Sequence, residues 1–157
     1  MVRRNWNVSA LVLLSASTVA CGGSASPAAP SAPASFLAGT WNGTLTIERE
    51  GEPTMSGPVS WTFEVVSDTN LQTFRTTIRS QHAWLPITTT VTTALTPGNT
   101  PPARISTQGT YPSPRGCIGT LLSVGTADAL RINADFSGAD CSTLAHSTFG
   151  GHVVLAR

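Results

Sequence analysis

The residues with catalytic or metal-binding chemistry are few in this 157-residue chain. The three histidines are His82, His146 and His152, and neither an H-x-x-x-H nor a C-x-x-C spacing of a zinc site occurs. His82 falls in a predicted connection, and His152 is out of phase with the apolar side chains of the last predicted strand. We therefore expect histidines that face solvent and predict no metal site.

The carboxylates also lack the spacing of a catalytic or calcium-binding motif. Three of them surround the first predicted turn: Glu48, Glu50 and Glu52. Paired acids about 5–10 Å apart can hydrolyse glycosidic bonds, but a polar hairpin tip is the commoner setting for such a group. Three more are spread too widely for one calcium loop and are expected at the surface: Asp128, Asp135 and Asp140. Nucleophile-elbow, phosphate-loop and dinucleotide motifs are absent, so we predict no enzyme activity and no cofactor.

The composition is near neutral and rich in hydroxyl side chains. Only 11% of residues are charged, against about 25% in a typical soluble domain. All nine basic residues are arginine, and the chain contains 23 threonines and 17 serines. Because the formal net charge is only +1, no basic surface for nucleic acid is predicted.

The first 20 residues have the pattern of a secretory signal. Arg3 and Arg4 form a positive start, and residues 8–19 are uncharged and mostly apolar. This run of about a dozen residues suits a signal peptide, because a membrane span needs about 20. A chain with such a signal is exported.

The end of this signal resembles the lipobox of bacterial lipoproteins, since small residues (Ser17-Thr18-Val19-Ala20) directly precede Cys21. The resemblance implies cleavage before Cys21, a lipid on its sulfur, and acylation of the new N-terminus. Thr18 departs from the pattern, which usually has a large aliphatic residue there. Gly22 after the cysteine implies the outer membrane, by similarity to enterobacterial lipoproteins. The alternative is an ordinary signal cleaved after Ala20, with Cys21 as a free thiol.

The chain therefore divides into three parts. Residues 1–20 are the predicted signal, and residues 21–35 are the lipidated cysteine with a tether of small residues and proline, which cannot bury a core. Residues 36–157 form the folded domain. Its two cysteines, Cys117 and Cys141, are expected to form a disulfide in an oxidising compartment. The alternative is a reactive thiol, such as Cys141 beside His146.

The folded domain is predicted to be all-β. Apolar and polar side chains alternate with a period of two, and no stretch keeps a helical period over three turns. Eight strands are predicted in this way, over residues 41–48, 59–66, 74–79, 87–95, 104–110, 117–124, 129–136 and 149–157. Short connections favour antiparallel neighbours and an up-and-down barrel, in which no strand edge stays open.

The start of the first strand, Gly39-Thr40-Trp41, together with Arg157 at the chain end, is similar to the lipocalin and wider calycin pattern. In that family the tryptophan packs at the closed end of the barrel, and a basic side chain lies across it. The resemblance therefore implies a Trp41–Arg157 contact. The Thr-Asp-Tyr marker of the family is missing from this chain. An avidin-like barrel and a β-sandwich remain alternatives.

Two functions follow from such a barrel. Leu130 is one of the side chains predicted to point into the barrel. Small inward residues such as Gly43 and Gly151 lie between larger ones, and this mixture favours a cavity. Candidate ligand-lining residues are Trp61, Phe63, Phe74, Ile132 and Phe136. The first hypothesis is a non-enzymatic, membrane-anchored module that binds a small apolar or amphipathic ligand. The alternative is an envelope protein with a filled barrel and a structural or protein-interaction role.

Overall fold

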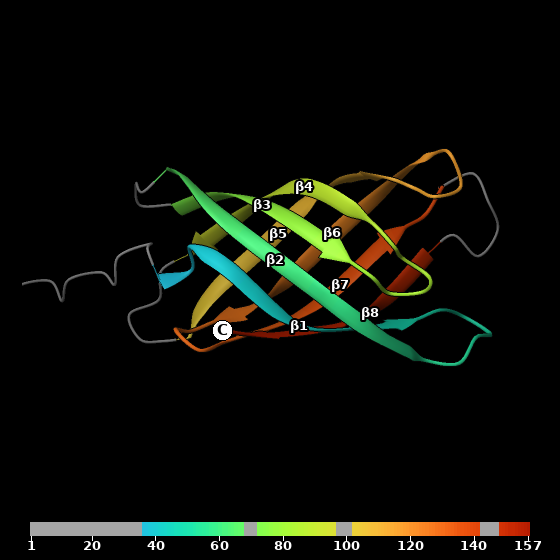
Figure 1. Ribbon diagram of the computed structural model, residues 1–157, viewed down its shortest axis with the longest axis horizontal. Coiled ribbons are helices and arrows are strands. Elements are labelled where there is room, and N and C mark those ends of the chain that lie inside the picture. The colour runs from blue at the N-terminus through green and yellow to red at the C-terminus, as the bar shows by residue number, and fades with distance from the viewer. Residues whose placement is uncertain (1–35, 68–71, 97–101, 142–147) are drawn as a thin grey trace, which may run out of the picture.

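The computed structural model describes residues 36–67, 72–96, 102–141 and 148–157. The predicted signal, Cys21 and the tether lie outside these residues. Eight strands run through the described part (Figure 1): β1 (Gly39–Glu48), β2 (Met55–Ser67), β3 (Gln72–Ser80), β4 (Thr88–Thr96), β5 (Ala103–Pro112), β6 (Ile118–Ala127), β7 (Arg131–Ala139) and β8 (Thr148–Ala156). Within the same ranges, no helix is long and apolar enough to cross a membrane.

The strands form one closed antiparallel barrel. Each strand pairs with the next along the chain, and β1 also pairs with β8, from Asn42 opposite Ala156 to Glu48 opposite Gly150. This strand order is that of an up-and-down, lipocalin-like barrel. It confirms the predicted barrel and excludes the alternative of a β-sandwich. Closure leaves the barrel without a terminal edge strand, although β4 and β5 pair only from Thr92 opposite Gln108 to Thr96 opposite Arg104.

Burial follows the alternation of residue types. In β3 and β4, every second side chain is buried, because neighbouring side chains of a strand point to opposite faces of the sheet. The buried side chains form one core inside the barrel, and its largest members include Trp41, Phe63, Phe74 and Tyr111. Outward residues, many of them threonine, cover the other face, together with exposed apolar side chains such as Leu122 and Val124 of β6.

The prediction that Leu130 points inward is wrong, because its side chain is 76% exposed. The β6–β7 turn extends further than the alternation suggested, and β7 begins only at Arg131. In this turn the Asp128 amide donates to Arg131 O, and the Asp128 carboxylate accepts the amide hydrogens of Leu130 and Arg131. Leu130 therefore belongs to the turn and not to the inward row of β7.

The small inward residues do not leave the space that the sequence suggested. A Cβ on Gly151 would lie 2.7 Å from Cε1 of Phe136, and one on Gly43 would lie 1.9 Å from the carbonyl oxygen of Val154. Cross-strand aromatic rings fill similar positions elsewhere, since Tyr111 covers Gly119. Glycine is thus required for close packing, and any ligand space must come from other parts of the interior.

Candidate functional site

At one end of the barrel, the first strand and the chain end meet. This end, called the Trp41 end, is formed by residues 37–41 and Arg157. The Trp41 indole N–H donates to Leu37 O at 2.8 Å. The Arg157 guanidinium carbon lies 4.7 Å from the centre of the Trp41 ring, and the same guanidinium donates to Ala38 O. The structure therefore places Trp41 and Arg157 together, with hydrogen-bond partners for both side chains.

The opposite end carries a second arginine with aromatic neighbours. This end, called the Trp84 end, is formed by the β1–β2 turn, the 81–87 connection and the β5–β6 turn. Arg49 follows β1 in phase with the buried Ile47, and its guanidinium carbon lies 5.3 Å from the Trp84 ring centre and 5.9 Å from that of Phe149. One terminal nitrogen donates to Trp84 O at 3.4 Å. The Nε–H is buried and has no hydrogen-bond partner among the described residues.

His82 holds the 81–87 connection at this end. Its Nε2 lies 3.1 Å from Met55 O, and its Nδ1 accepts the Trp84 amide hydrogen at 3.1 Å. This arrangement requires the neutral tautomer that carries its hydrogen on Nε2. The expectation that this histidine faces solvent is wrong, because the connection folds inward, with Leu85 in the core, and buries the His82 ring completely.

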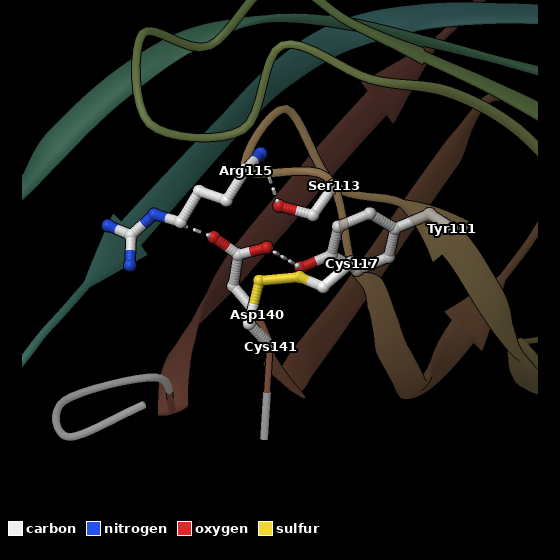
Figure 2. Close-up of a disulfide and its surroundings, with 6 residues drawn as sticks. All are labelled: Tyr111, Ser113, Arg115, Cys117, Asp140 and Cys141. Carbon is white, nitrogen blue, oxygen red and sulfur yellow. Dashed lines mark hydrogen bonds and ion pairs between the residues drawn. A yellow bond between two sulfur atoms is a disulfide. The ribbon is translucent and has the colours of Figure 1, made fainter. Parts of the chain in front are cut away.

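The disulfide lies at the same end, next to a buried acid (Figure 2). Cys117 and Cys141 are bonded with their Cα atoms 5.5 Å apart, which confirms the predicted pairing. Asp140 lies 3.4 Å from the Arg115 Nε, and it accepts the Tyr111 hydroxyl hydrogen at 3.4 Å. Burial, with the negative charge of Asp140 and that hydrogen bond, raises the pKa of Tyr111 far above its usual range.

Asp140 is therefore not the surface acid that its spacing suggested. Only 3% of the residue is exposed, because the disulfide and the β5–β6 turn draw it against Tyr111. Asp140 and the two cysteine sulfurs lie within 4.8 Å of one another. Since the sulfurs are bonded to each other, they are not thiolate ligands, and the carboxylate serves Arg115 and Tyr111.

The ligand-lining candidates are all buried in the core. They are Trp61, Phe63, Phe74, Ile132 and Phe136. The aromatic candidates lie in two groups. Phe63 lies 6.0 Å from both Trp61 and Phe74 on β2 and β3, whereas Phe136 lies on β7, 5.7 Å from Phe149 of β8.

The inner wall also carries polar atoms. Thr76 donates to Thr93 at 2.7 Å, and the Thr93 and Thr107 hydroxyls are 2.7 Å apart. Three hydroxyl hydrogens thus serve two hydrogen bonds, so one hydrogen has no partner within this row. On the neighbouring strand β6, the Ser123 hydroxyl is buried without a partner among the described residues, and so is the Trp61 indole N–H on β2.

The other acids and histidines that the structure describes do not converge on a site. The first-turn glutamates Glu48, Glu50 and Glu52 are exposed. Asp135 is outward-facing and lies 2.9 Å from the His152 Nδ1, with 90% of the aspartate side chain exposed. His146 lies outside the described residues.

The outer face over β4–β8 is hollowed into an open groove of about 850 Å³. Its lining is uncharged and includes hydroxyl side chains together with Gln108 and Leu122. The hydroxyl side chains come from neighbouring strands and are Thr92, Thr110, Thr120, Ser137 and Thr148.

Comparison of the chain with protein-family models, with curated proteins and with solved structures finds no match. Of the groups described above, Arg49 and the buried Ser123 were not among the site residues predicted from the sequence. The phase of Arg49 relative to Ile47 was the one available signal for the first.

Proposed function

We propose that this protein is a non-enzymatic binding module whose barrel takes one small amphipathic ligand. The observation that carries the proposal is that two buried donors on the inner wall, the Trp61 indole N–H and the Ser123 hydroxyl, have no partner among the described residues. Leaving such a group unpaired costs about 1–3 kcal/mol. A ligand with oxygen atoms that reach these groups recovers that free energy on binding.

The rest of the inner wall favours an apolar portion in the same ligand. The aromatic groups around Phe63 and Phe136 are the kind of lining that binds apolar molecules, while a few polar groups set the orientation. The hydroxyl hydrogen that has no partner within the Thr76–Thr93–Thr107 row adds a third donor. Apolar walls with few donors favour an amphipathic molecule over a sugar or a nucleotide.

The proposed location is the cell envelope, with a lipid on Cys21 that anchors the barrel in the outer membrane through the 22–35 tether. The support is the signal-like start and the small residues before the cysteine. In a bacterial host, Cys21→Ser should release the protein from the membrane fraction, and the wild-type N-terminal peptide should carry acyl mass. A wild-type protein that fractionates as soluble and carries an unmodified thiol would refute the anchor.

The ligand is tested on the mature chain with Cys21→Ser, purified without detergent. Native mass spectrometry and solvent extraction should recover one small molecule per chain. Ser123→Ala and Trp61→Phe should each weaken its binding about fivefold or more, since each removes one donor. Ser137→Ala, on the outer face of β7, is the matched control and should change nothing. An empty protein whose two donors bind only water would overturn the proposal.

The outer groove over β4–β8 favours a second candidate, an envelope protein that binds a neutral partner such as a glycan strand. Uncharged hydroxyl groups can hydrogen-bond to a polymer without charge pairing. Cross-linking in cells from a probe placed at Gln108 should then capture one dominant partner. A random set of neighbours would count against this candidate.

A further inference from the structure

We propose that the polar head of the ligand is a carboxylate, bound at the Trp84 end by Arg49. This inference rests on the proposed function, because it names the chemistry of the same ligand. It is carried by an arginine that is partly buried and lacks the counter-charge that buried cations require.

The charge pattern at this end leaves Arg49 without an acid. Arg115 lies 3.4 Å from Asp140, so the one buried carboxylate of the described residues is already paired. In the part of the chain that the structure describes, no carboxylate lies within ion-pair distance of Arg49. The nearby glutamates of the β1–β2 turn, Glu50 and Glu52, are exposed to water. An anion from outside the chain would supply the missing charge.

The geometry of the guanidinium favours a planar anion. Trp84 and Phe149 lie within 6 Å of the guanidinium carbon, and a planar guanidinium can stack on aromatic faces while its donors stay in its own plane. The edge carries the donors, and here the Nε–H is unused while a terminal nitrogen makes only a 3.4 Å bond to Trp84 O. A carboxylate accepts two parallel hydrogen bonds from such an edge.

The position of Arg49 connects this anion to the barrel interior. Arg49 continues the inward row of β1 after Ile47, and Phe149 beneath it contacts Phe136 of the inner wall. A ligand whose carboxylate lies at Arg49 can therefore direct its apolar part toward the core. Trp84 covers the same end, and its backbone N–H donates a hydrogen bond to His82 Nδ1, which holds it in place.

The test compares lauric acid with dodecanol, which share one chain and differ in the head group. Both are titrated by isothermal calorimetry into the delipidated mature chain carrying Cys21→Ser. We expect the acid to bind at least about tenfold more tightly than the alcohol. Arg49→Met should remove this preference, and Arg49→Lys, which keeps the charge without the planar edge, should retain part of it. Arg157→Met, at the other end of the barrel, is the control and should keep the full preference.

The outcomes separate the two proposals. If both probes bind with equal affinity, or if the preference for the acid survives Arg49→Met, the head-group inference is overturned and the barrel ligand stands. If neither probe binds and solvent extraction also recovers nothing, the proposed function fails and the inference fails with it. Unfolding midpoints of both methionine variants show whether each is folded when it is titrated.

Discussion

Both ends of the barrel place an arginine beside a tryptophan, but the hydrogen bonding at the two ends differs. At the Trp41 end, the indole N–H donates to Leu37 O, and Arg157 donates to Ala38 O. At the Trp84 end, the Arg49 Nε–H is buried without a partner in the described part of the chain. The arginine–tryptophan pair at the Trp41 end thus has hydrogen-bond partners for both side chains, whereas at the Trp84 end one arginine donor has none among the described residues.

This difference leads us to expect that the two ends affect different properties of the protein. The Trp41 end joins β1 to the chain end, so its contacts hold the closing seam of the barrel. The Trp84 end consists of turns and the 81–87 connection. The disulfide and the His82 hydrogen bond to Met55 O hold these segments together. Groups that lose free energy through missing partners are common where a ligand supplies them. We therefore expect substitutions at the first end to change stability and those at the second to change binding.

The largest expected effect comes from Trp41→Ala. The ring is fully buried, so its removal should lower the free energy of unfolding by about 3–5 kcal/mol. Trp84→Ala should cost only about 1–2 kcal/mol, because Trp84 is partly exposed. Urea unfolding of the Cys21→Ser chain measures both. Equal losses at the two tryptophans would contradict the proposed division between the ends.

Reduction of the disulfide comes next in size. Cys117 and Cys141 are 24 positions apart, and releasing a loop of this length should cost about 3 kcal/mol through the entropy of the unfolded chain. Adding dithiothreitol should lower the urea midpoint of the wild type. The double variant Cys117→Ser, Cys141→Ser should start low and not respond. An unchanged wild-type midpoint, after thiol titration shows full reduction, would refute the prediction.

Much of the fold could be predicted from the sequence, because the period of two is a local signal. Alternation of residues such as Val91, Thr93 and Leu95 identifies a strand and its inward face without knowledge of its neighbours. Closure then follows from eight short-linked strands, and it brings Trp41 and Arg157 together. Leu130 was misplaced because a turn interrupts the alternation, and the turn depends on the hydrogen bonds of Asp128.

The groups at the Trp84 end could not be predicted in the same way. His82 and Asp140 lie in irregular segments, where no period indicates which way a side chain faces. Their burial results from tertiary contacts, with Met55 and Trp84 for the histidine and with Tyr111 for the acid. The Arg49 Nε–H and the Ser123 hydroxyl have no partner among the described residues, which is a property of the packed barrel that the residue types alone do not indicate.

The third prediction compares the two arginines directly. Arg157→Met removes a cation–π contact and a hydrogen bond, and should lower the free energy of unfolding by about 1–2 kcal/mol. Arg49→Met removes a similar ring contact and the 3.4 Å hydrogen bond to Trp84 O, but also a buried N–H that has no partner in the described part of the chain. Its stability should therefore stay within about 0.5 kcal/mol of the wild type. Both are measured by urea unfolding without ligand. A larger loss at Arg49 than at Arg157 would indicate that Arg49 serves the fold and not a ligand.

The smallest expected effect concerns Asp128, at the β6–β7 turn near the Trp41 end. Its carboxylate accepts the amide hydrogens of Leu130 and Arg131, which lowers the pKa of Asp128. A lowered pKa means that the ionised carboxylate stabilises the fold above its ordinary pKa, and that this stabilisation is lost as the pH falls through the lowered value. The thermal midpoint of Asp128→Ala should therefore lie slightly below that of the wild type at neutral pH and meet it in strong acid. Asp128→Asn accepts hydrogen bonds but does not titrate, so its difference from Asp128→Ala should not change with pH. A gap between the wild type and Asp128→Ala that stays constant down to strong acid would assign the effect to the turn geometry and not to the charge.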